Sequence, residues 1–363
     1  MLLNITTLPG DGIGPEVTEQ AVHVLQSIAD SSGHTLKITQ KNIGGAALVA
    51  SNDPLPPDTI ADCLNSSAVL LGAVGGPAFD SYPAKLRPEA GLLRLRSELG
   101  VFANLRPAIC LKGLEDLSPL RQDVVRGTDV MIVRELLGGL YFGERSTKGG
   151  PGSRRAADTM AYSESEIERI ARIAFQLARQ RRKRLTSVDK ANVLDCSRLW
   201  REVVNHVGSE FSDVQLSHMY VDSAAMALVS RPTQFDVILT ENMFGDILSD
   251  QAGAVVGSLG LLPSASVGGK VGLYEPIHGS APDIAGQGIA NPLGAILSVA
   301  MLLRHSFKLE AEAASIESAV REILAEGHRT RDLAGQGEPS ISTREMGELV
   351  AGRVRERVQI PAR

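Results

Sequence analysis

Short apolar runs alternate with amphipathic segments along most of the chain. The apolar runs have the length of β-strands, and the segments between them repeat apolar residues at the three- and four-residue spacing of an α-helix. The clearest strand candidates are residues 4–9, 68–74, 129–136, 185–193 and 235–240. This alternation predicts an α/β fold.

The helical segments have recognisable ends. A long helix is predicted to follow Ser163, whose hydroxyl begins a capping box with Glu166. Its basic end, residues 179–184, is interpreted as a solvated helix terminus rather than a nucleic-acid patch, because positive charge there complements the helix dipole. Two further amphipathic segments, 310–327 and 343–357, are predicted to pack on the outside of a sheet.

Residues 146–158 interrupt this pattern with a stretch rich in glycine, serine and arginine. Such a composition is typical of connections rather than of packed elements. We expect a mobile surface loop or arm there.

A glycine-rich turn near the start of the chain, residues 8–19, raises the question of nucleotide binding. Gly10, Gly12 and Gly14 form G-x-G-x-G, whereas the dinucleotide fingerprint is G-x-G-x-x-G, and Pro15 stands where its last glycine belongs. A proline suits the first turn of a helix. The segment predicts a strand-to-helix turn, and its own residues leave open whether the turn is structural or touches a ligand.

Composition narrows the class of protein. With 363 residues, of which 43% are hydrophobic and 22% charged, the chain is long enough for two globular domains or one large α/β unit. A net charge of −5 offers no electrostatic footprint for nucleic acid. Three widely spaced cysteines without a C-x-x-C pair favour reduced thiols over disulfides or a zinc site. No signal peptide or membrane-spanning run is evident, so we expect a cytoplasmic protein that binds neither membrane nor nucleic acid.

Three aspartates follow strand-like runs. Asp246 and Asp250 are four residues apart, a spacing that places both carboxylates on one face of a helix. Asp222 stands at another strand-to-helix junction. Acidic residues that complement a helix dipole would explain the pair equally well. Together, three carboxylates without a nearby histidine or cysteine suit a hard cation, Mg²⁺ or Mn²⁺.

Cationic residues form a second group. Arg94, Arg96, Arg106 and Arg134 could together clamp a di- or tricarboxylate, because guanidinium groups bind carboxylates bidentately. For any single arginine a surface salt bridge is an alternative, except for Arg134, whose charge closes an apolar strand. Lys190 closes a strand among apolar neighbours, where partial desolvation suits a general base. The alternatives for this lysine are that its side chain extends to water or that it pairs with Asp189.

Residues 275–292 are dense in glycine, alanine and proline. A loop of this composition lets backbone amides approach a ligand closely. His278 and Asp283 within it also have ordinary explanations, as a hydrogen-bonded structural histidine and a turn residue.

In chain order, these stretches resemble the β-decarboxylating dehydrogenase family, which covers isopropylmalate, isocitrate, homoisocitrate and tartrate dehydrogenases. The matching motifs are LPGDGIGPEV, GLLRLR, NLRPA, VRELLGGLYFGE, SVDKANVL, YVD, NMFGDILSD and EPIHGSAPDIAGQGIANP. The resemblance implies a two-domain, non-Rossmann α/β fold with its active site in the interdomain cleft. Residues 1–101 and 257–363 would form a discontinuous NAD-binding domain. Residues 102–256 would bind substrate and metal and build a homodimer.

The resemblance also assigns roles to residues. Arg96, Arg106 and Arg134 would bind the two malate carboxylates. Asp246 and Asp250, with Asp222 from the neighbouring subunit, would hold Mg²⁺ or Mn²⁺ against the substrate, so that Asp222 serves substrate, metal and catalysis alike.

Two further residues receive catalytic roles from the resemblance. Lys190, also from the neighbouring subunit, would accept the hydroxyl proton as hydride leaves for the nicotinamide. Tyr141 would help to protonate the enolate that remains after loss of CO₂.

The resemblance places the coenzyme mainly on the late loop, with the early glycine turn as one wall. Asp283 could accept hydrogen bonds from both adenosine ribose hydroxyls and would repel a 2′-phosphate, which predicts NAD rather than NADP. The other expected coenzyme residues are Glu275, His278, Gly279, Ser280, Ala281, Ile284 and Asn291.

The substrate side chain is expected to meet an apolar surface. Leu92 and Leu93, with Glu89 beside them and Val193 completing the wall, suit an isopropyl group, whose burial is worth roughly 1.5–3 kcal/mol. Packing of the two leucines into a core is the alternative. These residues predict metal- and NAD-dependent oxidative decarboxylation of 3-isopropylmalate.

Two competing functions share most of these residues: oxidation of tartrate or malate, and a catalytically silent relative that binds carboxylates or a partner protein. Within the broader stretches that match the family, Glu241, Gln251 and Ser266 have no explanation from the sequence alone.

Overall fold

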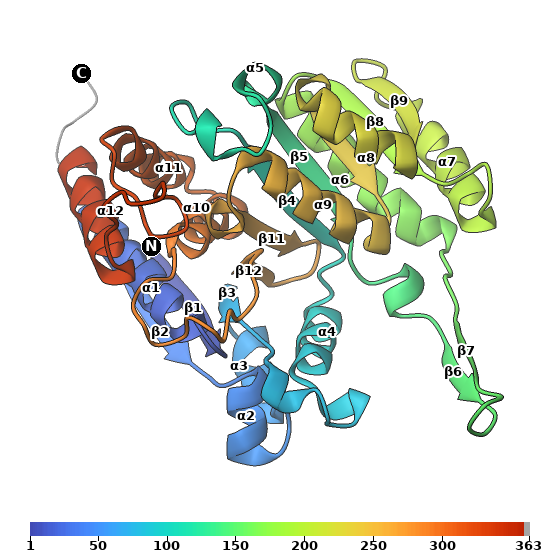
Figure 1. Cartoon of the computed structure of the whole chain (residues 1–363), viewed down its shortest axis with the longest axis horizontal. Helices are drawn as coiled ribbons and strands as arrows, with labels where there is room; N and C mark the ends of the chain where they lie inside the picture. Colours follow the sequence, from blue (N-terminus) through green and yellow to red (C-terminus); the bar gives the residue numbers. More distant parts are fainter. Residues whose placement is uncertain (359–363) are drawn as a thin grey trace. The chain divides into compact units, whose positions relative to one another are not determined.

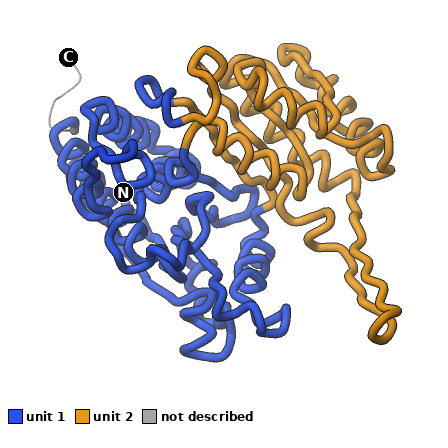
Figure 2. The backbone as a smooth tube through the Cα atoms, in the orientation of Figure 1, with its two compact units in different colours: residues 1–101, 111–117, 258–363 blue, residues 102–110, 118–257 orange. Residues whose placement is uncertain are grey.

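The computed structural model describes residues 1–358 and divides them into two compact units. Unit 1 contains residues 1–101, residues 111–117 and the C-terminal part of the chain from residue 258. Unit 2 contains residues 102–110 and 118–257 (Figure 2). Each unit has a five-stranded portion of β-sheet with helices packed against it (Figure 1).

The strands of unit 1 lie in the order β2-β1-β3-β12-β11. Pairing is parallel from β2 to β12, and β11 is antiparallel to β12. Every residue of β3 is buried, as expected for a strand of a parallel sheet that is covered on both faces. The strands are β1 (Leu2–Gly10), β2 (Thr35–Gln40), β3 (Ala68–Ala73), β11 (Pro263–Val267) and β12 (Gly272–Pro276).

The helices of unit 1 include the predicted turn-to-helix start, because α1 (Gly14–Ser31) begins with Pro15 in its first turn. This helix packs against α10 (Leu293–Phe307) and α12 (Thr343–Val358). The remaining α-helices of the unit are α2 (Gly44–Ser51), α3 (Pro57–Leu64), α4 (Pro88–Leu99) and α11 (Glu310–Ala325).

The strands of unit 2 lie in the order β4-β5-β10-β8-β9 and are parallel except for β4, which is antiparallel to β5. They are β4 (Ala103–Ile109), β5 (Asp129–Glu135), β8 (Arg184–Asp189), β9 (Gln215–Tyr220) and β10 (Val237–Thr240). The α-helices are α5 (Gln122–Val125), α6 (Glu164–Gln180), α7 (Asp195–Gly208), α8 (Val221–Ser230) and α9 (Asn242–Val256).

The parallel strands of unit 2 end at one edge of the sheet, where α/β proteins place their ligands. Arg134 lies at the end of β5, and Lys190 directly follows β8. Asp222 is in the first turn of α8, after β9, and α9 follows β10. Strand order therefore brings the predicted chemical groups of this unit to a common edge.

The predicted elements are confirmed where local signals were strong. All five strand candidates contain a strand, and Ser163 and Glu166 form the predicted capping box at the start of α6. The segment expected to be a loop or arm is a two-stranded hairpin, β6 (Arg145–Lys148) and β7 (Arg155–Asp158), with every residue exposed. It projects from the rest of unit 2 (Figure 1). Among the described residues, no helix is long and apolar enough to cross a membrane.

Candidate active site

Two predicted clamp arginines and two predicted metal ligands come together in unit 2. The Nη1 atom of Arg106 lies 3.3 Å from an oxygen of Asp250 and 3.6 Å from an oxygen of Asp246. Arg134, almost fully buried, pairs through Nη1 with Asp246. The two aspartates lie one turn apart on α9, so the arginines offset a repulsion that would otherwise act between the carboxylates.

Tyr141 belongs to the same group. It ends the 3₁₀ turn Gly139–Tyr141, and its hydroxyl donates to Asp246 Oδ2 over 2.9 Å. The guanidinium carbon of Arg134 lies 5.6 Å from the centroid of the ring. Burial raises the pKa of Tyr141, and the charge of Asp246 raises it further. The phenol therefore keeps its proton at neutral pH and is available as a donor.

Asp250 is more exposed than Asp246, with 60% of its side-chain surface accessible against 34%. Desolvation still raises the pKa of Asp250, the Arg106 guanidinium lowers it, and the charge of Asp246 raises it. An exposed carboxylate beside a second one is a suitable oxygen donor for a hard cation.

Lys190 and Asp222 form a separate pair in the same unit. The ammonium of Lys190 donates to Asp222 Oδ1 over 2.8 Å, and this hydrogen bond lowers the pKa of Asp222. Asp189 is buried and binds Arg201 through two hydrogen bonds of 2.8 and 2.9 Å. The alternative that Lys190 pairs with Asp189 is therefore wrong.

The three predicted metal ligands do not meet within one chain. In the part of the chain that the structure describes, no three histidine, cysteine, aspartate or glutamate side chains are close enough to hold a metal ion. Asp246 and Asp250 supply two neighbouring carboxylates, and Asp222 is with Lys190 instead.

Arg96 has an unexpected partner inside unit 1. It is buried on α4, and its Nη2 atom donates to Glu275 Oε1 over 2.7 Å. A residue expected to bind substrate and one expected to bind coenzyme are thus paired with each other. The Nε atom of Arg96 is buried without a hydrogen-bond partner in the structure.

The predicted apolar surface lies on α4 and on the loop after Lys190. Leu92 and Leu93 are only partly buried, whereas Leu95 and Leu99 are buried on the same helix. Packing into the core therefore accounts for Leu95 and Leu99 better than for Leu92 and Leu93. Glu89 is exposed in the first turn of α4, and Val193, in unit 2, is 60% exposed.

The early glycine turn packs directly on the predicted coenzyme loop. The N–H of Ile13 donates to the carbonyl of Ser280 over 2.8 Å. Gly12 has φ +57°, and a Cβ atom there would lie 1.9 Å from the same carbonyl oxygen. Only glycine permits this contact, so the turn has a structural role as one side of the loop.

The predicted coenzyme residues differ in how far they are already engaged. Asn291 is buried, accepts the N–H of Leu293 at the start of α10 and donates to Asp332. Burial lowers the pKa of His278, whose Nε2 atom is buried without a hydrogen-bond partner. Asp283 is exposed. The other loop members, Gly279, Ala281 and Ile284, are exposed or partly exposed.

Asp11 was missed by reasoning from the sequence. Its carboxylate accepts the N–H groups of Gly45, Ala46 and Gly75, each over 2.8 Å, and so joins the glycine turn to the start of α2 and to the loop after β3. These segments, with Pro282, line a pocket of about 530 Å³ in unit 1. An acidic residue between two glycines was the available signal.

The structure explains two of the three unassigned motif residues. Glu241 is the N-cap of α9, accepting the N–H groups of Met243 and Phe244. Gln251 donates to the carbonyl of Ala225 over 2.8 Å and links α9 to α8. Ser266 is buried in β11.

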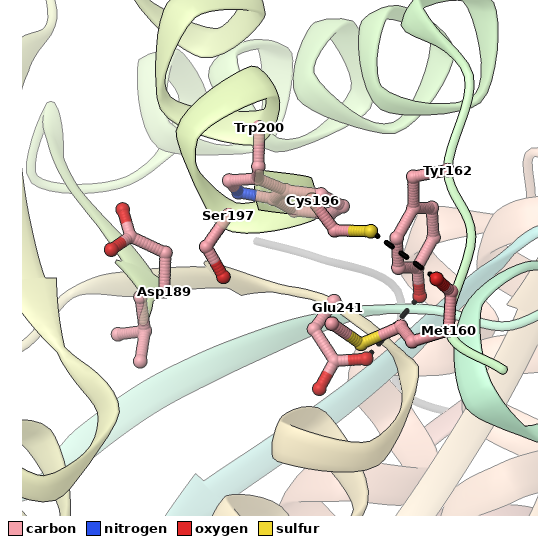
Figure 3. A pocket seen from close by; sticks show the side chains of 8 residues that line it. Met160, Tyr162, Asp189, Cys196, Ser197, Trp200 and Glu241 are labelled. Atoms are coloured by element: carbon pink, nitrogen blue, oxygen red, sulfur yellow. Dashed lines mark hydrogen bonds between the residues drawn. The ribbon is translucent and has the colours of Figure 1, made fainter. Parts of the chain in front are cut away.

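A small cavity lies behind the start of α9. Figure 3 shows Tyr162 directed at Glu241, with Cys196 and Trp200 beside them. The volume of about 10 Å³ is close to that needed by one water molecule, so this cavity is too small for a substrate or coenzyme.

Comparison with known proteins agrees with these features. The family model described as isocitrate/isopropylmalate dehydrogenase matches residues 4–350. The 3-isopropylmalate dehydrogenase of Moorella thermoacetica is 57% identical over 96% of this chain and 98% of its own length. That of Bacillus subtilis is 54% identical, with 96% of each chain covered.

Solved structures give the same result. The isocitrate dehydrogenase of Methylococcus capsulatus has a TM-score of 0.86 at 35% identity, covering 97% of this chain and 99% of its own. A β-decarboxylating dehydrogenase of Thermococcus kodakarensis has a TM-score of 0.80 at 36% identity, covering 98% and 97%. The resemblance seen in the sequence motifs is confirmed, and the chain belongs to the isocitrate/isopropylmalate dehydrogenase family.

Proposed function

We propose that the chain is a metal- and NAD-dependent 3-isopropylmalate dehydrogenase, which oxidatively decarboxylates 3-isopropylmalate to 2-oxo-4-methylpentanoate and CO₂ in leucine biosynthesis. The observation that carries the chemistry is the unit 2 group, in which Arg106, Arg134 and Tyr141 surround the carboxylates of Asp246 and Asp250. The choice of substrate is supported by relatives at 52–57% identity that bear this enzyme's name.

The arginines bind the substrate. Arg106 and Arg134 present planar cationic groups that match carboxylates, and Arg96 is assigned the same role. The buried Nε atom of Arg96 is a donor that a substrate carboxylate could satisfy. Burying these guanidinium groups strengthens their electrostatic attraction to a dianionic substrate.

The aspartates hold the cation. Asp246 and Asp250, together with Asp222 of the partner subunit, offer only oxygen donors, which fits Mg²⁺ or Mn²⁺. When bound, such a cation stabilises the negative charge that develops on the substrate oxygen during oxidation and decarboxylation.

Two residues move protons. Lys190 of the partner subunit accepts the proton of the substrate hydroxyl while the hydride on the same carbon leaves. The carboxylate next to the isopropyl-bearing carbon is then lost as CO₂. Tyr141, kept protonated by its surroundings, donates toward the carbon that becomes carbanionic.

The coenzyme is assigned to the late loop of unit 1. NAD bound there would serve as the hydride acceptor. We assign the exposed carboxylate of Asp283 to the adenosine ribose hydroxyls and the unpartnered Nε2 atom of His278 to a further polar contact. Backbone groups of Gly279, Ser280 and Ala281, with the side chains of Ile284 and Asn291, complete the proposed coenzyme surface.

The substrate side chain is assigned to the two partly exposed leucines of α4. Leu92 and Leu93 keep part of their surface accessible and provide apolar contact for an isopropyl group, while an extra carboxylate would lose solvation against them. Glu89 of unit 1 and Val193 of unit 2 are assigned to the substrate side chain as well.

We assign a homodimer in the cytoplasm, with active sites shared between subunits. Met226 on α8 and Ile247 on α9 are 66% and 58% exposed, although apolar side chains of this size favour burial. An isolated two-stranded hairpin such as β6–β7 is marginal by itself and gains stability from a partner surface. The dimer would also supply Lys190 and Asp222 to each site.

The test follows reduction of NAD spectroscopically with Mn²⁺ and either 3-isopropylmalate, isocitrate, tartrate or malate. We expect rapid reduction with 3-isopropylmalate only, abolished by EDTA and restored by excess Mn²⁺. Activity with isocitrate alone would show that the proposed substrate is wrong, while the proposed mechanism would still apply. Activity that persists in EDTA would refute the metal site, and inactivity with all four acids would refute the enzyme.

A further inference from the structure

Asn242 lies at the centre of the hydrogen bonds behind the unit 2 group. It is the first residue of α9, and only 1% of it is exposed. Its Oδ1 atom accepts from Arg134 Nε over 3.2 Å and from Arg134 Nη2 over 2.8 Å. Its Nδ2 atom donates to the carbonyl of Gly138 over 3.0 Å. One amide group thus contacts both the clamp arginine and the turn that leads to Tyr141.

These contacts define the orientation of the amide. A carbonyl oxygen is needed beside the two guanidinium donors, and an NH₂ group is needed beside the carbonyl of Gly138. Exchanging the two ends would set donor against donor and acceptor against acceptor. Asparagine alone satisfies both sides without carrying a charge.

The backbone of Asn242 is also held in place. Its N–H donates to the hydroxyl of Tyr162 over 3.0 Å, and Glu241 caps the same helix end. The ring of Tyr162 stands edge-on to Trp200, with 5.6 Å between the ring centroids. Figure 3 shows the Tyr162 hydroxyl facing Glu241 below that indole. The start of α9 is therefore anchored to a rigid aromatic pair.

Tyr162 also explains the paired glycines before Tyr141. A Cβ atom on Gly138 would lie 2.7 Å from a ring carbon of Tyr162, and one on Gly139 would lie 2.3 Å from its hydroxyl. Gly139 has φ +71°, which strongly favours glycine. The Tyr141 turn thus lies directly against the residue that supports Asn242.

The guanidinium of Arg134 is consequently aimed by its neighbours. Asn242 occupies the edge that carries Nε and Nη2, and Nη1 is directed at Asp246. A neutral amide orients the cation without cancelling its charge. An acidic residue in its place would form an ion pair and reduce the attraction between Arg134 and a substrate carboxylate.

We propose that Asn242 is a positioning residue, which orients Arg134 for a substrate carboxylate, adds no negative charge beside it and couples it to the Tyr141 turn. The proposal rests on the proposed function, because it takes Arg134 to be a substrate ligand.

The decisive variant is Asn242→Asp, which preserves size and shape but adds a charge. We expect the KM for the hydroxy acid to rise about tenfold or more, because the aspartate competes for Arg134 and repels the carbonyl of Gly138. The KM for NAD should stay within about twofold. Tyr162→Phe, which removes only the hydroxyl behind Asn242, should give a smaller rise of the same kind. Steady-state kinetics with each reactant varied measures both effects.

Asn205→Asp is the matched control. Asn205 is exposed on α7, and its amide oxygen is 2.8 Å from His218 Nε2. The substitution therefore adds the same negative charge to unit 2, but at a residue that contacts neither Arg134 nor the Tyr141 turn. The control should keep both KM values. An unchanged KM for the hydroxy acid in Asn242→Asp would overturn the proposal, as would an equal loss in both variants.

The wild type separates this proposal from the proposed function. If the wild type does not oxidise 3-isopropylmalate, the proposed function fails, and the same comparison is made with the 2-hydroxy dicarboxylate that it does oxidise. If the wild type is active on no hydroxy acid, Arg134 is not a substrate ligand and both proposals fail. If the wild type is active and Asn242→Asp has the same KM for the hydroxy acid, the proposed function stands and only the positioning role of Asn242 is refuted.

Discussion

Opposite charges are closely matched among the proposed catalytic residues of unit 2. Asp246 is held by Arg134 and Tyr141, and Asp222 is held by Lys190. These contacts hold the carboxylates in place. Substrate and cation would replace protein partners rather than enter an unpaired set of charges, which limits the cost of keeping like charges together.

Asp283 determines coenzyme choice in our proposal. Asp283→Ala should raise the KM for NAD about tenfold and leave the KM for NADP unchanged or lower, because hydrogen bonds to the ribose are lost while repulsion of a 2′-phosphate is relieved. Initial rates with each coenzyme measure the change in preference. Asp30→Ala, which removes an exposed carboxylate near the end of α1, is the control. If Asp283→Ala keeps the wild-type preference for NAD over NADP, the adenosine does not bind at Asp283 and the assignment is wrong.

At the scale of elements, α9 carries much of the site. Its N-cap Glu241, its first residue Asn242 and its two aspartates serve different functions on successive turns. The helix continues from β10 at the carboxyl edge of the sheet. Any substitution in the first turn of α9 should therefore change the arrangement of the charged side chains in unit 2 as well as the free energy of unfolding.

Glu241 makes the stability of this helix end depend on pH. Burial raises the pKa of Glu241 above its usual 4.5, although its bonds to Phe244 and Met243 lower it. The folded protein therefore holds this proton more tightly than the unfolded chain does. The contribution to folding is fully present below pH 4.5 and is lost as the pH rises through the folded-state pKa.

Glu241→Gln removes this titration while keeping a side-chain oxygen for the cap. The unfolding free energy of the wild type, relative to that of Glu241→Gln, should fall as the pH is raised from below 4.5 to neutrality. Urea titrations of both proteins at several pH values measure this difference. Glu164→Gln, at an exposed position in the first turn of α6, controls for the loss of one charge. A difference that does not vary with pH, or that rises, would contradict the assignment.

At the scale of the molecule, our proposal requires a second copy of the chain to complete the site. Lys190→Ala and Asp250→Asn should each be almost inactive alone, since the first removes the proton acceptor and the second a metal ligand. In a heterodimer of the two, one active site carries both substitutions and the other carries neither. Dissociating and reassociating an equal mixture should therefore restore about a quarter of wild-type activity.

Activity of the reassociated mixture and its mass by sedimentation measure this outcome. Separately reassociated samples of each variant are the controls and should stay inactive. If the mixture forms dimers but regains no activity, each site is built from a single chain and the shared-site proposal is wrong.

The sequence by itself determined the features whose signals are local. The capping box of Ser163 and Glu166 lies within four consecutive residues, and the proximity of Asp246 to Asp250 needs only one helical turn. Strand length and the start of α1 at Pro15 were also recognisable, because backbone preferences and hydrophobic periodicity act over short distances. Family membership followed from the order of the motifs along the chain.

Only the tertiary structure decided which partners these residues have. Arg96 meets Glu275 across 179 positions, Arg134 meets Asn242 across 108, and Asp11 meets Gly75 across 64. Lys190 binds Asp222 rather than its chain neighbour, whose carboxylate is taken by Arg201. Such pairings depend on strand order and helix packing, which arise from burial of the whole core, and no short segment of sequence specifies them.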